Sequence, residues 1–161
     1  DTSPKNKKKL FIIKKFKETL RIGLLKAHPQ MFVEEIKMYH KFDGLILEGT
    51  GLGHFPLETY DTKTKEHELI LKEINKLTQK IPLIMTTQTI FGVVNMNVYA
   101  PGRKLLAAQV IGNNLNMTPE TAYIKLAWLL SNYPKTKIDE YFSKNLRGEI
   151  STQTGYEEKF I

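Results

Sequence analysis

The stretch that decides the fold is GLILE at residues 44–48, where apolar residues follow one another without polar alternation. Such a run is typical of a strand that is buried on both faces, as in a parallel sheet. Two further short apolar runs flank it, RIGLLK at residues 21–26 and PLIMTT at residues 82–87. The three runs predict three strands.

Helical patterns separate these runs. Residues 32–41 and 63–80 carry apolar side chains at helical spacing. A strand, helix, strand, helix, strand order predicts right-handed crossovers and a parallel sheet. Two more helices are expected at residues 118–131, which start with a threonine N-cap and a proline, and at residues 136–145. We therefore predict an α/β fold with three layers, a parallel sheet flanked by helices.

The composition fits one folded domain. The chain has 161 residues, of which 41% are hydrophobic and 25% are charged, and it contains no cysteine. Disulfides and thiolate chemistry are therefore excluded. No apolar run approaches the roughly 20 residues of a membrane helix, so we expect a cytoplasmic protein with no membrane partner. Because the first residue is Asp1 rather than methionine, we expect a piece of a longer or processed chain.

The net charge of +7 is concentrated at the start of the chain. Residues 1–21 hold eight basic residues against two acidic ones, and the rest of the chain is nearly balanced. Such a segment could touch phosphates. A solvated linker with one short strand at residues 10–13 is the favoured interpretation, because no platform of stacked aromatic residues interleaves with the lysines. We therefore divide the chain into a basic linker at residues 1–20 and an α/β domain at residues 21–161.

Ligands of an open parallel sheet bind beyond the carboxyl ends of its strands, so the loops there are the candidate sites. The loop at residues 48–56, EGTGLGHFP, has Gly49, Gly51 and Gly53 at alternate positions. A phosphate cradle is disfavoured, because neither a lysine nor a helix start follows as a P-loop requires. We instead expect a tight loop that packs closely against its surroundings.

His54 ends this loop and could serve as a ligand or a proton shuttle. No second histidine or carboxylate lies near it at metal-binding spacing, so we expect no metal site. Thr86, Thr87 and Gln88 lie at the end of the third strand. Such hydrogen-bonding side chains could bind an amide or carboxylate substrate, or could satisfy backbone groups at a turn. These alternatives stay open, and no complete catalytic constellation is visible in the sequence.

Several segments, in order, resemble the second domain of the type I asparaginases and their relatives. They are GLILEGTGLGHFP at 44–56, IPLIMTTQTIFGVVNMNVYAPGRKLLAAQVI at 81–111, MTPETAYIKLAWLL at 117–130 and NLRGEI at 145–150. The resemblance covers residues 21–161 and implies the fold of the smaller C-terminal domain of these enzymes.

Details within these segments are most similar to the D subunits of glutamyl-tRNA(Gln) amidotransferases. They are TGLGH, NMNVY followed by GR, and the tail that runs past GEI. The resemblance implies an amidase that releases ammonia from glutamine or asparagine, and a partner, the E subunit of the amidotransferase, that uses it on tRNA-bound glutamate. The D subunit would therefore meet tRNA only indirectly. No cofactor is expected on this chain, and ATP and Mg would bind only to the partner.

The same resemblance places the nucleophilic threonine in an N-terminal domain, in a TGGT-like motif that this sequence lacks. No catalytic residue is therefore expected in this chain, and the isolated chain should be inactive. Contributors to a site shared with the N-terminal domain or with another copy would be Thr50, His54, Thr86, Thr87 and Gln88. Two departures put ligand binding by the neighbouring loops in doubt, since Val93 replaces a usual arginine and Asn116 a usual acidic residue.

Two other functions compete with the D-subunit assignment. The first is the C-terminal domain of a stand-alone type I L-asparaginase, which would differ in amide preference and in independence from tRNA. The second is a non-catalytic dimerisation or interaction module whose basic N-terminal segment touches RNA. In each case we expect the chain to associate with another copy or with a partner domain, because its glycine-rich and threonine-rich loops should pack against something.

Overall fold

Three parallel strands form the sheet in the order β1-β2-β3. They are β1 (Ile22–Lys26), β2 (Gly44–Gly49) and β3 (Leu83–Thr87) in a computed structural model that describes residues 13–151. Ile46 of β2 pairs with Leu24 on one side and with Ile84 on the other. The central strand is therefore the GLILE segment, and all three predicted strands are confirmed.

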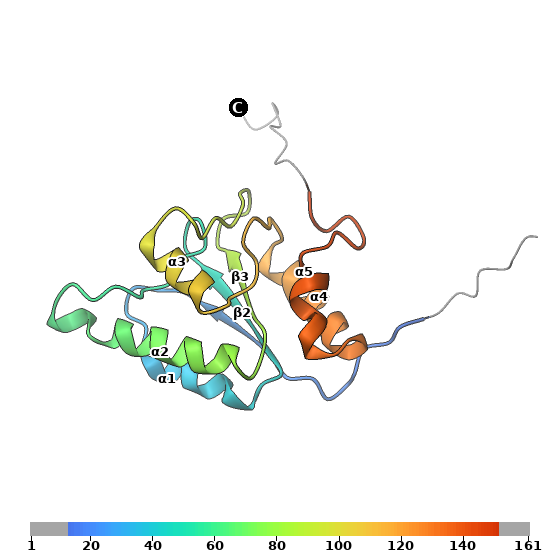
Figure 1. The fold of residues 1–161 in the computed structure, drawn as a ribbon, viewed down its shortest axis with the longest axis horizontal. Coiled ribbons are helices and arrows are strands. Elements are labelled where there is room, and N and C mark those ends of the chain that lie inside the picture. Colours follow the sequence, from blue (N-terminus) through green and yellow to red (C-terminus); the bar gives the residue numbers. More distant parts are fainter. Residues whose placement is uncertain (1–12, 152–161) are drawn as a thin grey trace, which may run out of the picture.

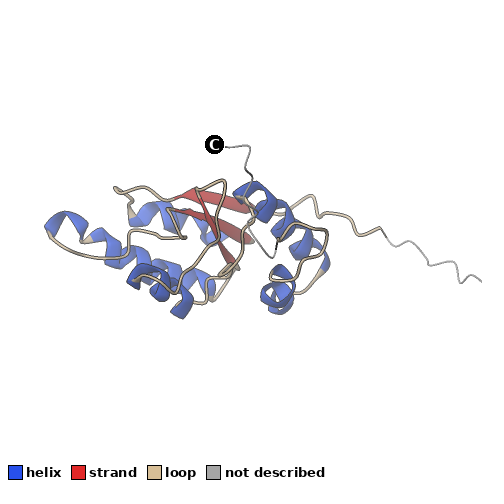
Figure 2. Ribbon diagram, turned by 90° about the horizontal axis from the view of Figure 1, so that it is seen from above, coloured by secondary structure: helices blue, strands red, loops and turns tan. Residues whose placement is uncertain are grey.

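Helices cover both faces of this sheet. Figure 1 shows α1 and α2 on one side of the strands and α4 and α5 on the other, and Figure 2 shows the strands between these two groups. The helices are α1 (Val33–Lys37), α2 (Glu66–Thr78), α3 (Ala100–Ala107), α4 (Pro119–Asn132) and α5 (Ile138–Phe142), with short 3-10 turns at Met38–Lys41, Thr62–Thr64 and Lys135–Lys137. The predicted three-layer α/β fold is confirmed.

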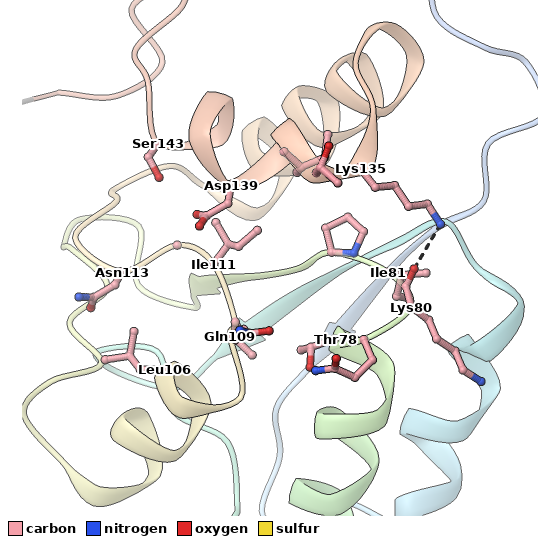
Figure 3. A pocket seen from close by; sticks show the side chains of 16 residues that line it. Thr78, Lys80, Ile81, Leu106, Gln109, Ile111, Asn113, Lys135, Asp139 and Ser143 are labelled. Atoms are coloured by element: carbon pink, nitrogen blue, oxygen red, sulfur yellow. Dashed lines mark hydrogen bonds between the residues drawn. The ribbon is translucent and has the colours of Figure 1, made fainter.

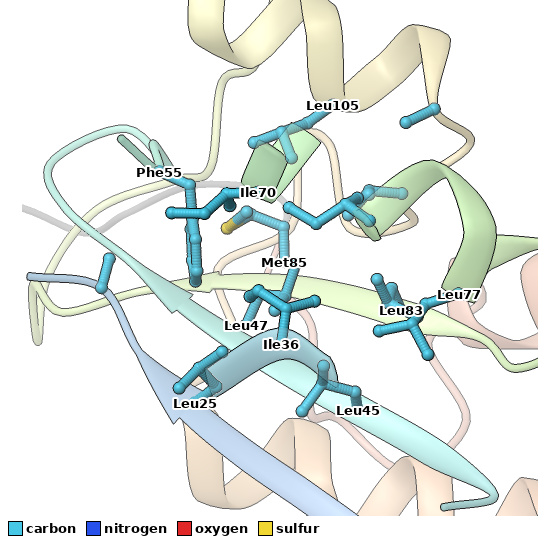
Figure 4. Close-up of a cluster of buried hydrophobic side chains, with 14 of the residues drawn as sticks. Leu25, Ile36, Leu45, Leu47, Phe55, Ile70, Leu77, Leu83, Met85 and Leu105 are labelled. Carbon is cyan, nitrogen blue, oxygen red and sulfur yellow. The ribbon is translucent and has the colours of Figure 1, made fainter. Parts of the chain in front are cut away.

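The side-chain alternation of the strands divides the core in two. Leu45 and Leu47 of β2 point into the cluster under α1, α2 and α3, which Figure 4 shows together with Met85. Ile46 and Ile84 point the other way, into the cluster under α4 and α5. These strand side chains are almost completely buried. Burial on both faces explains why β2 and β3 lack polar alternation, whereas Leu24 and Lys26 of β1 are exposed.

The helices differ from their predicted bounds in two ways. The pattern at residues 32–41 gives α1 and then a 3-10 turn, and the last helix is shorter than the predicted 136–145, with Ile138 and Phe142 as its buried residues. Helix α3 was not predicted. Its start contains Pro101, which fits the first turn, and Gly102, which lowers the helical signal. Gly102 is required because a Cβ there would lie 2.5 Å from the carbonyl oxygen of Met96.

A single residue extends the sheet beyond β3. Ile111 forms a parallel bridge with Ile84, where its N–H donates to Leu83 O at 2.9 Å and its O accepts from Met85 N at 2.7 Å. Gly112 follows with φ of 118°, and a Cβ there would lie 2.3 Å from Met85 O. A glycine is therefore needed for the chain to pass so close to β3.

The described part of the basic segment lies along α4. Lys14 Nζ donates to Tyr133 Oη at 2.8 Å and lies over the rings of Tyr133 and Trp128. The N–H of Lys17 donates to Ser131 Oγ at 2.9 Å. The predicted linker thus makes specific contacts here, including aromatic ones that the sequence did not suggest. Most of the predicted strand at residues 10–13 lies outside the described residues, as do the lysines before it and the tail from residue 152.

Candidate functional site

The carboxyl ends of β2 and β3 bring the two unusual loops together. The register pairs Glu48 with Thr86 and Gly49 with Thr87, so the glycine-rich and threonine-rich loops begin side by side. The N–H of Gln88 then donates to Gly49 O at 2.9 Å, and the N–H of Asn95 donates to Leu52 O at 2.9 Å. The two loops are thus joined by backbone hydrogen bonds at Gly49 and at Leu52.

The glycine loop is a closed turn. The N–H of Thr50 donates to His54 O, and the N–H of His54 donates to Thr50 O, both at 3.0 Å. Gly51 and Gly53 have φ angles of 50° and 94°, and a Cβ on Gly49 would lie 2.7 Å from His54 N. The glycines therefore allow positive φ and close backbone approach, as the tight-loop interpretation predicted.

The side chain of Thr87, the last residue of β3, binds this turn. Its hydroxyl donates to the carbonyl oxygen of Gly51 and accepts from the N–H of Thr89 at 3.2 Å. The Oγ1 of Thr89 lies 3.1 Å from the Oγ1 of Thr87. A hydroxyl has one proton and two lone pairs, so these contacts use its full hydrogen-bonding capacity. Thr87 is 3% exposed and is occupied in holding the loop.

Thr86 and Gln88 also bind backbone carbonyl groups. The hydroxyl of Thr86, which is buried, donates to Leu47 O at 3.1 Å. The Nε2 of Gln88 donates to Ala27 O at 2.9 Å and lies 3.4 Å from Glu48 O. Gln88 thereby ties the loop after β1 to the ends of the other two strands. Of the two alternatives left open by the sequence, the contacts observed are those of side chains that satisfy backbone groups.

His54 has the least satisfied side chain of the five. Its Nε2 is buried and makes no hydrogen bond to the described residues. The ring packs edge to face against Tyr99, with the centroids 5.2 Å apart. Burial lowers the pKa of His54, so the ring is neutral at pH 7. Thr50, by contrast, is exposed, at the start of the turn.

The surface around these loops is apolar. Ile90, Val98 and Tyr99, all in the segment between β3 and α3, are between 47% and 79% exposed. An apolar surface around polar loops is typical of an interaction site.

The strand ends also carry an ion pair that was not predicted from the sequence, between Lys26 Nζ and Glu48 Oε1 at 2.8 Å. The parallel register places Lys26 opposite Glu48, so opposite charges at the ends of the two predicted strands could have indicated this ion pair.

A pocket of about 780 Å³ lies elsewhere, on the side where β3 begins (Figure 3). Pro82, Gln109, Asn113 and Asp139 are among its lining residues, and Lys135 Nζ donates to Lys80 O at 3.3 Å across one side. None of the five predicted site residues lines it.

Within residues 13–151, no group of three or more His, Asp or Glu side chains converges in a way that could hold a metal ion. No helix of that part is long and apolar enough to span a bilayer.

The chain matches a known class of domain, with a three-layer α/β fold and its loops at the carboxyl edge of the sheet. Residues 21–142 match the family described as "Glutaminase/Asparaginase C-terminal domain", which covers more than half of the chain. The chain therefore belongs to this family.

Among its relatives are proteins named as the D subunit of glutamyl-tRNA(Gln) amidotransferase. The one from Methanobrevibacter smithii is 38% identical over 138 residues, covering 83% of this chain and 29% of the relative. The one from Methanococcus maripaludis strain C5 is 41% identical over 139 residues, covering 85% of this chain and 31% of the relative. The chain thus spans about three tenths of the length of these relatives.

Solved structures of asparaginases share the fold. The thermostable L-asparaginase from Thermococcus kodakarensis superimposes with a TM-score of 0.71 at 27% identity, over 83% of this chain and 38% of the other. L-asparaginase I from Vibrio cholerae gives a TM-score of 0.70 at 26% identity, over 86% of this chain and 40% of the other. Both comparisons agree with the family assignment.

Proposed function

We propose that this chain is the C-terminal part of the amidase subunit of a tRNA-dependent amidotransferase. In this role it helps to release ammonia from glutamine or asparagine, for conversion of Glu-tRNA(Gln) to Gln-tRNA(Gln) in the cytoplasm. The observation that carries the proposal is the 36–41% identity to amidotransferase D subunits from several archaea. The substrate, partner and tRNA assignments are transferred from those relatives.

The nucleophilic threonine then comes from an N-terminal domain, on the same chain or on a separate one. The observation that supports this division is the state of the threonines at the carboxyl edge. Thr86 and Thr87 donate their hydroxyl protons to backbone carbonyl oxygens, so neither is poised to attack a carbonyl carbon. The ring of His54 packs against Tyr99, and its Nε2 has no hydrogen-bond partner in the described part of the chain, so it is not hydrogen-bonded to either threonine through that atom.

The five predicted site residues fit different parts in this arrangement. Thr50 and His54 sit on the glycine turn and would face the domain that carries the nucleophile. Thr86, Thr87 and Gln88 would fix the position of that turn through their backbone hydrogen bonds. The exposed apolar side chains beside the turn, Ile90 and Val98 among them, would be covered by the same domain or by another copy of the chain.

Complementation tests the proposal directly. Glutaminase and asparaginase activity is measured for this chain alone and after mixing with a polypeptide that carries the TGGT-containing domain. We expect no activity alone and activity on mixing, with the nucleophile supplied in trans. Addition of the E subunit, ATP, Mg and Glu-tRNA(Gln) should then give Gln-tRNA(Gln). Activity of the chain alone would overturn the division of labour proposed here.

A stand-alone L-asparaginase is the second candidate, because the solved structures that share the fold are asparaginases. The two candidates differ in the complemented enzyme. The amidotransferase should accept glutamine and deliver ammonia to its E subunit, whereas an asparaginase should prefer asparagine and be indifferent to that partner. Equal rates with and without the E subunit and tRNA, with asparagine strongly preferred, would favour the asparaginase.

A further inference from the structure

A groove of about 890 Å³ runs along the outer side of α4, away from the loops described above. One wall is the N-terminal segment, with Ile13 and Phe16, and the floor is the helix, with Ile124 and Trp128. Leu146, in the loop after α5, belongs to the other wall. The groove is therefore bordered by the two segments that connect the described domain to the rest of the chain.

Both walls are held in place by side-chain contacts. On the N-terminal side, Lys14 bonds to Tyr133 and lies over two aromatic rings. On the other side, Lys125 Nζ of the helix lies 2.6 Å from Glu149 Oε1 of the loop. The groove is thus formed by fixed elements, and a binding segment would have little to reorganise.

The groove leaves large apolar side chains uncovered. Ile13, Phe16 and Ile124 are 71%, 51% and 57% exposed, respectively. Contiguous apolar surface between polar rims is typical of a site that another segment covers. Lys14 lies on one rim and Arg147 on the other. Glu120 also lines the groove, whereas the carboxylate of Glu149 is paired with Lys125, so the remaining charges give a net positive rim. The chemistry of the groove therefore suits a segment that combines apolar anchors with acidic residues.

We propose that the C-terminal segment, TQTGYEEKFI at residues 152–161, docks in this groove through Tyr156, Phe160 and Ile161. Tyr156 and Phe160 are spaced i, i+4, as in peptides that lay one apolar face in a groove. Glu157, Glu158 and Lys159 lie between them, so this stretch carries a net charge of −1, opposite in sign to Lys14 and Arg147 on the rims. No comparable pattern occurs in residues 1–12, which are rich in lysine and would repel those rims.

The segment begins at the right place to reach the groove. The N–H of Ser151 donates to Asn116 Oδ1 at 3.2 Å, just before α4 starts. The groove extends along α4 from Glu120 to Trp128, which is about 12 Å at 1.5 Å per residue. Ten residues span up to about 33 Å when extended, so the segment reaches the far end of the groove even if part of it coils.

Trp128 is the single tryptophan of the chain and lines the groove, so its fluorescence reports whether the groove is covered. In the full chain, Phe160→Ala and Tyr156→Ala should each shift the emission to the red and increase quenching by acrylamide. Gln153→Ala is the matched control, a polar position of the same segment, and should change neither. An unchanged far-UV circular dichroism spectrum shows that the fold is intact in each variant.

A groove-side variant completes a double-mutant cycle. Ile124→Glu introduces a charge that repels Glu157 and Glu158 and should release the segment. Phe160→Ala should then have no further effect on Trp128 quenching in the Ile124→Glu background, because the contact is already lost. Full additivity of the two changes, or Trp128 signals indifferent to Tyr156 and Phe160, would overturn the proposal. An effect that appears only as protein concentration rises would assign the groove to a second copy instead.

Discussion

Lys125 of α4 and Glu149 of the closing loop form an ion pair in which Nζ lies 2.6 Å from Oε1 and both side chains are nearly buried. Lys125 also donates to Lys144 O at 2.6 Å, and its ammonium group lies 5.3 Å from the centroid of the Phe142 ring. Glu149 in turn accepts from the backbone N–H of Leu146 at 3.0 Å. The pair therefore fastens the C-terminal loop to the helix and to α5.

Replacement of Glu149 by glutamine should destabilise the domain strongly. The buried ammonium group of Lys125 would lose its counter-charge, and breaking such a pair costs about 3–5 kcal/mol. Glu140→Gln is the control, because Glu140 also bridges two lysines, Lys137 and Lys144, but on the exposed surface. Chemical denaturation should show a much larger loss for Glu149→Gln than for Glu140→Gln. Equal losses would mean that burial does not set the strength of the pair.

The same pair predicts how stability depends on pH. Burial alone would raise the pKa of the Glu149 carboxyl, but the hydrogen bonds from Lys125 and from Leu146 N–H outweigh it and lower the pKa to about 2. A carboxyl with a lowered pKa stabilises the folded state above its ordinary pKa of about 4.5, and this contribution is lost as the pH falls towards 2.

We therefore expect the free energy of unfolding to fall between pH 4.5 and pH 2 by up to about 3 kcal/mol from this group. Hydrogen bonds from Lys137 and Lys144 also lower the pKa of Glu140 to about 2, so Glu140 titrates in the same range. Denaturation curves at several pH values should show a flatter acid limb for Glu149→Gln than for Glu140→Gln. The reverse order would contradict the assignment.

The hydroxyl of Thr87 gives a third prediction, at the carboxyl edge of the sheet. Thr87→Val keeps the shape of the side chain but leaves Gly51 O without its donor, which should cost about 1–3 kcal/mol. Thr87→Ser keeps the hydroxyl and should cost clearly less. In the complemented amidase, Thr87→Val should reduce activity because the turn that carries Thr50 and His54 is no longer held.

The control for Thr87 separates positioning from catalysis. If Thr87 were a nucleophile, serine would preserve activity and valine would abolish it without destabilising the fold. If Thr87 holds the turn, loss of activity should track loss of stability across both variants. Denaturation midpoints and initial rates measured on the same preparations distinguish these outcomes.

The strands could be predicted from the sequence because their signal is local. Leu45, Ile46 and Leu47 follow one another because β2 is buried on both faces, and this apolar run can be seen without knowing which helices cover it. Helix α3 could not be predicted in the same way. Its Gly102 weakens the helical pattern, and the reason for a glycine there is the carbonyl oxygen of Met96, which only the folded chain brings within reach.

For the candidate site, the sequence likewise showed the local features but not the contacts between distant residues. The sequence located the two loops, because glycine at alternate positions and a run of threonines are visible without a structure. It could not decide what the hydroxyls of Thr86 and Thr87 do, since their acceptors, Leu47 O and Gly51 O, lie 39 and 36 residues away along the chain. A hydroxyl that binds a substrate and one that binds a distant carbonyl look alike in a sequence.

Two glycines with similar backbone angles provide the last prediction. Gly112 and Gly148 have φ of 118° and 92°, which are costly for any residue with a Cβ. The two glycines differ in the room available for an added Cβ atom. A Cβ on Gly148 would meet nothing within 4 Å, whereas one on Gly112 would lie 2.3 Å from Met85 O. Gly148→Ala should therefore show only the backbone cost, about 1–3 kcal/mol for a strained φ.

Gly112→Ala should cost considerably more, because the clash pushes the chain away from β3. The two hydrogen bonds of Ile111, to Leu83 O and from Met85 N, would then be lost or lengthened. Hydrogen exchange at the amides of Ile111 and Met85 should accelerate in Gly112→Ala, while in Gly148→Ala both amides should keep their protection. Protection that is equal in the two variants would mean that the bridge does not depend on the absent side chain.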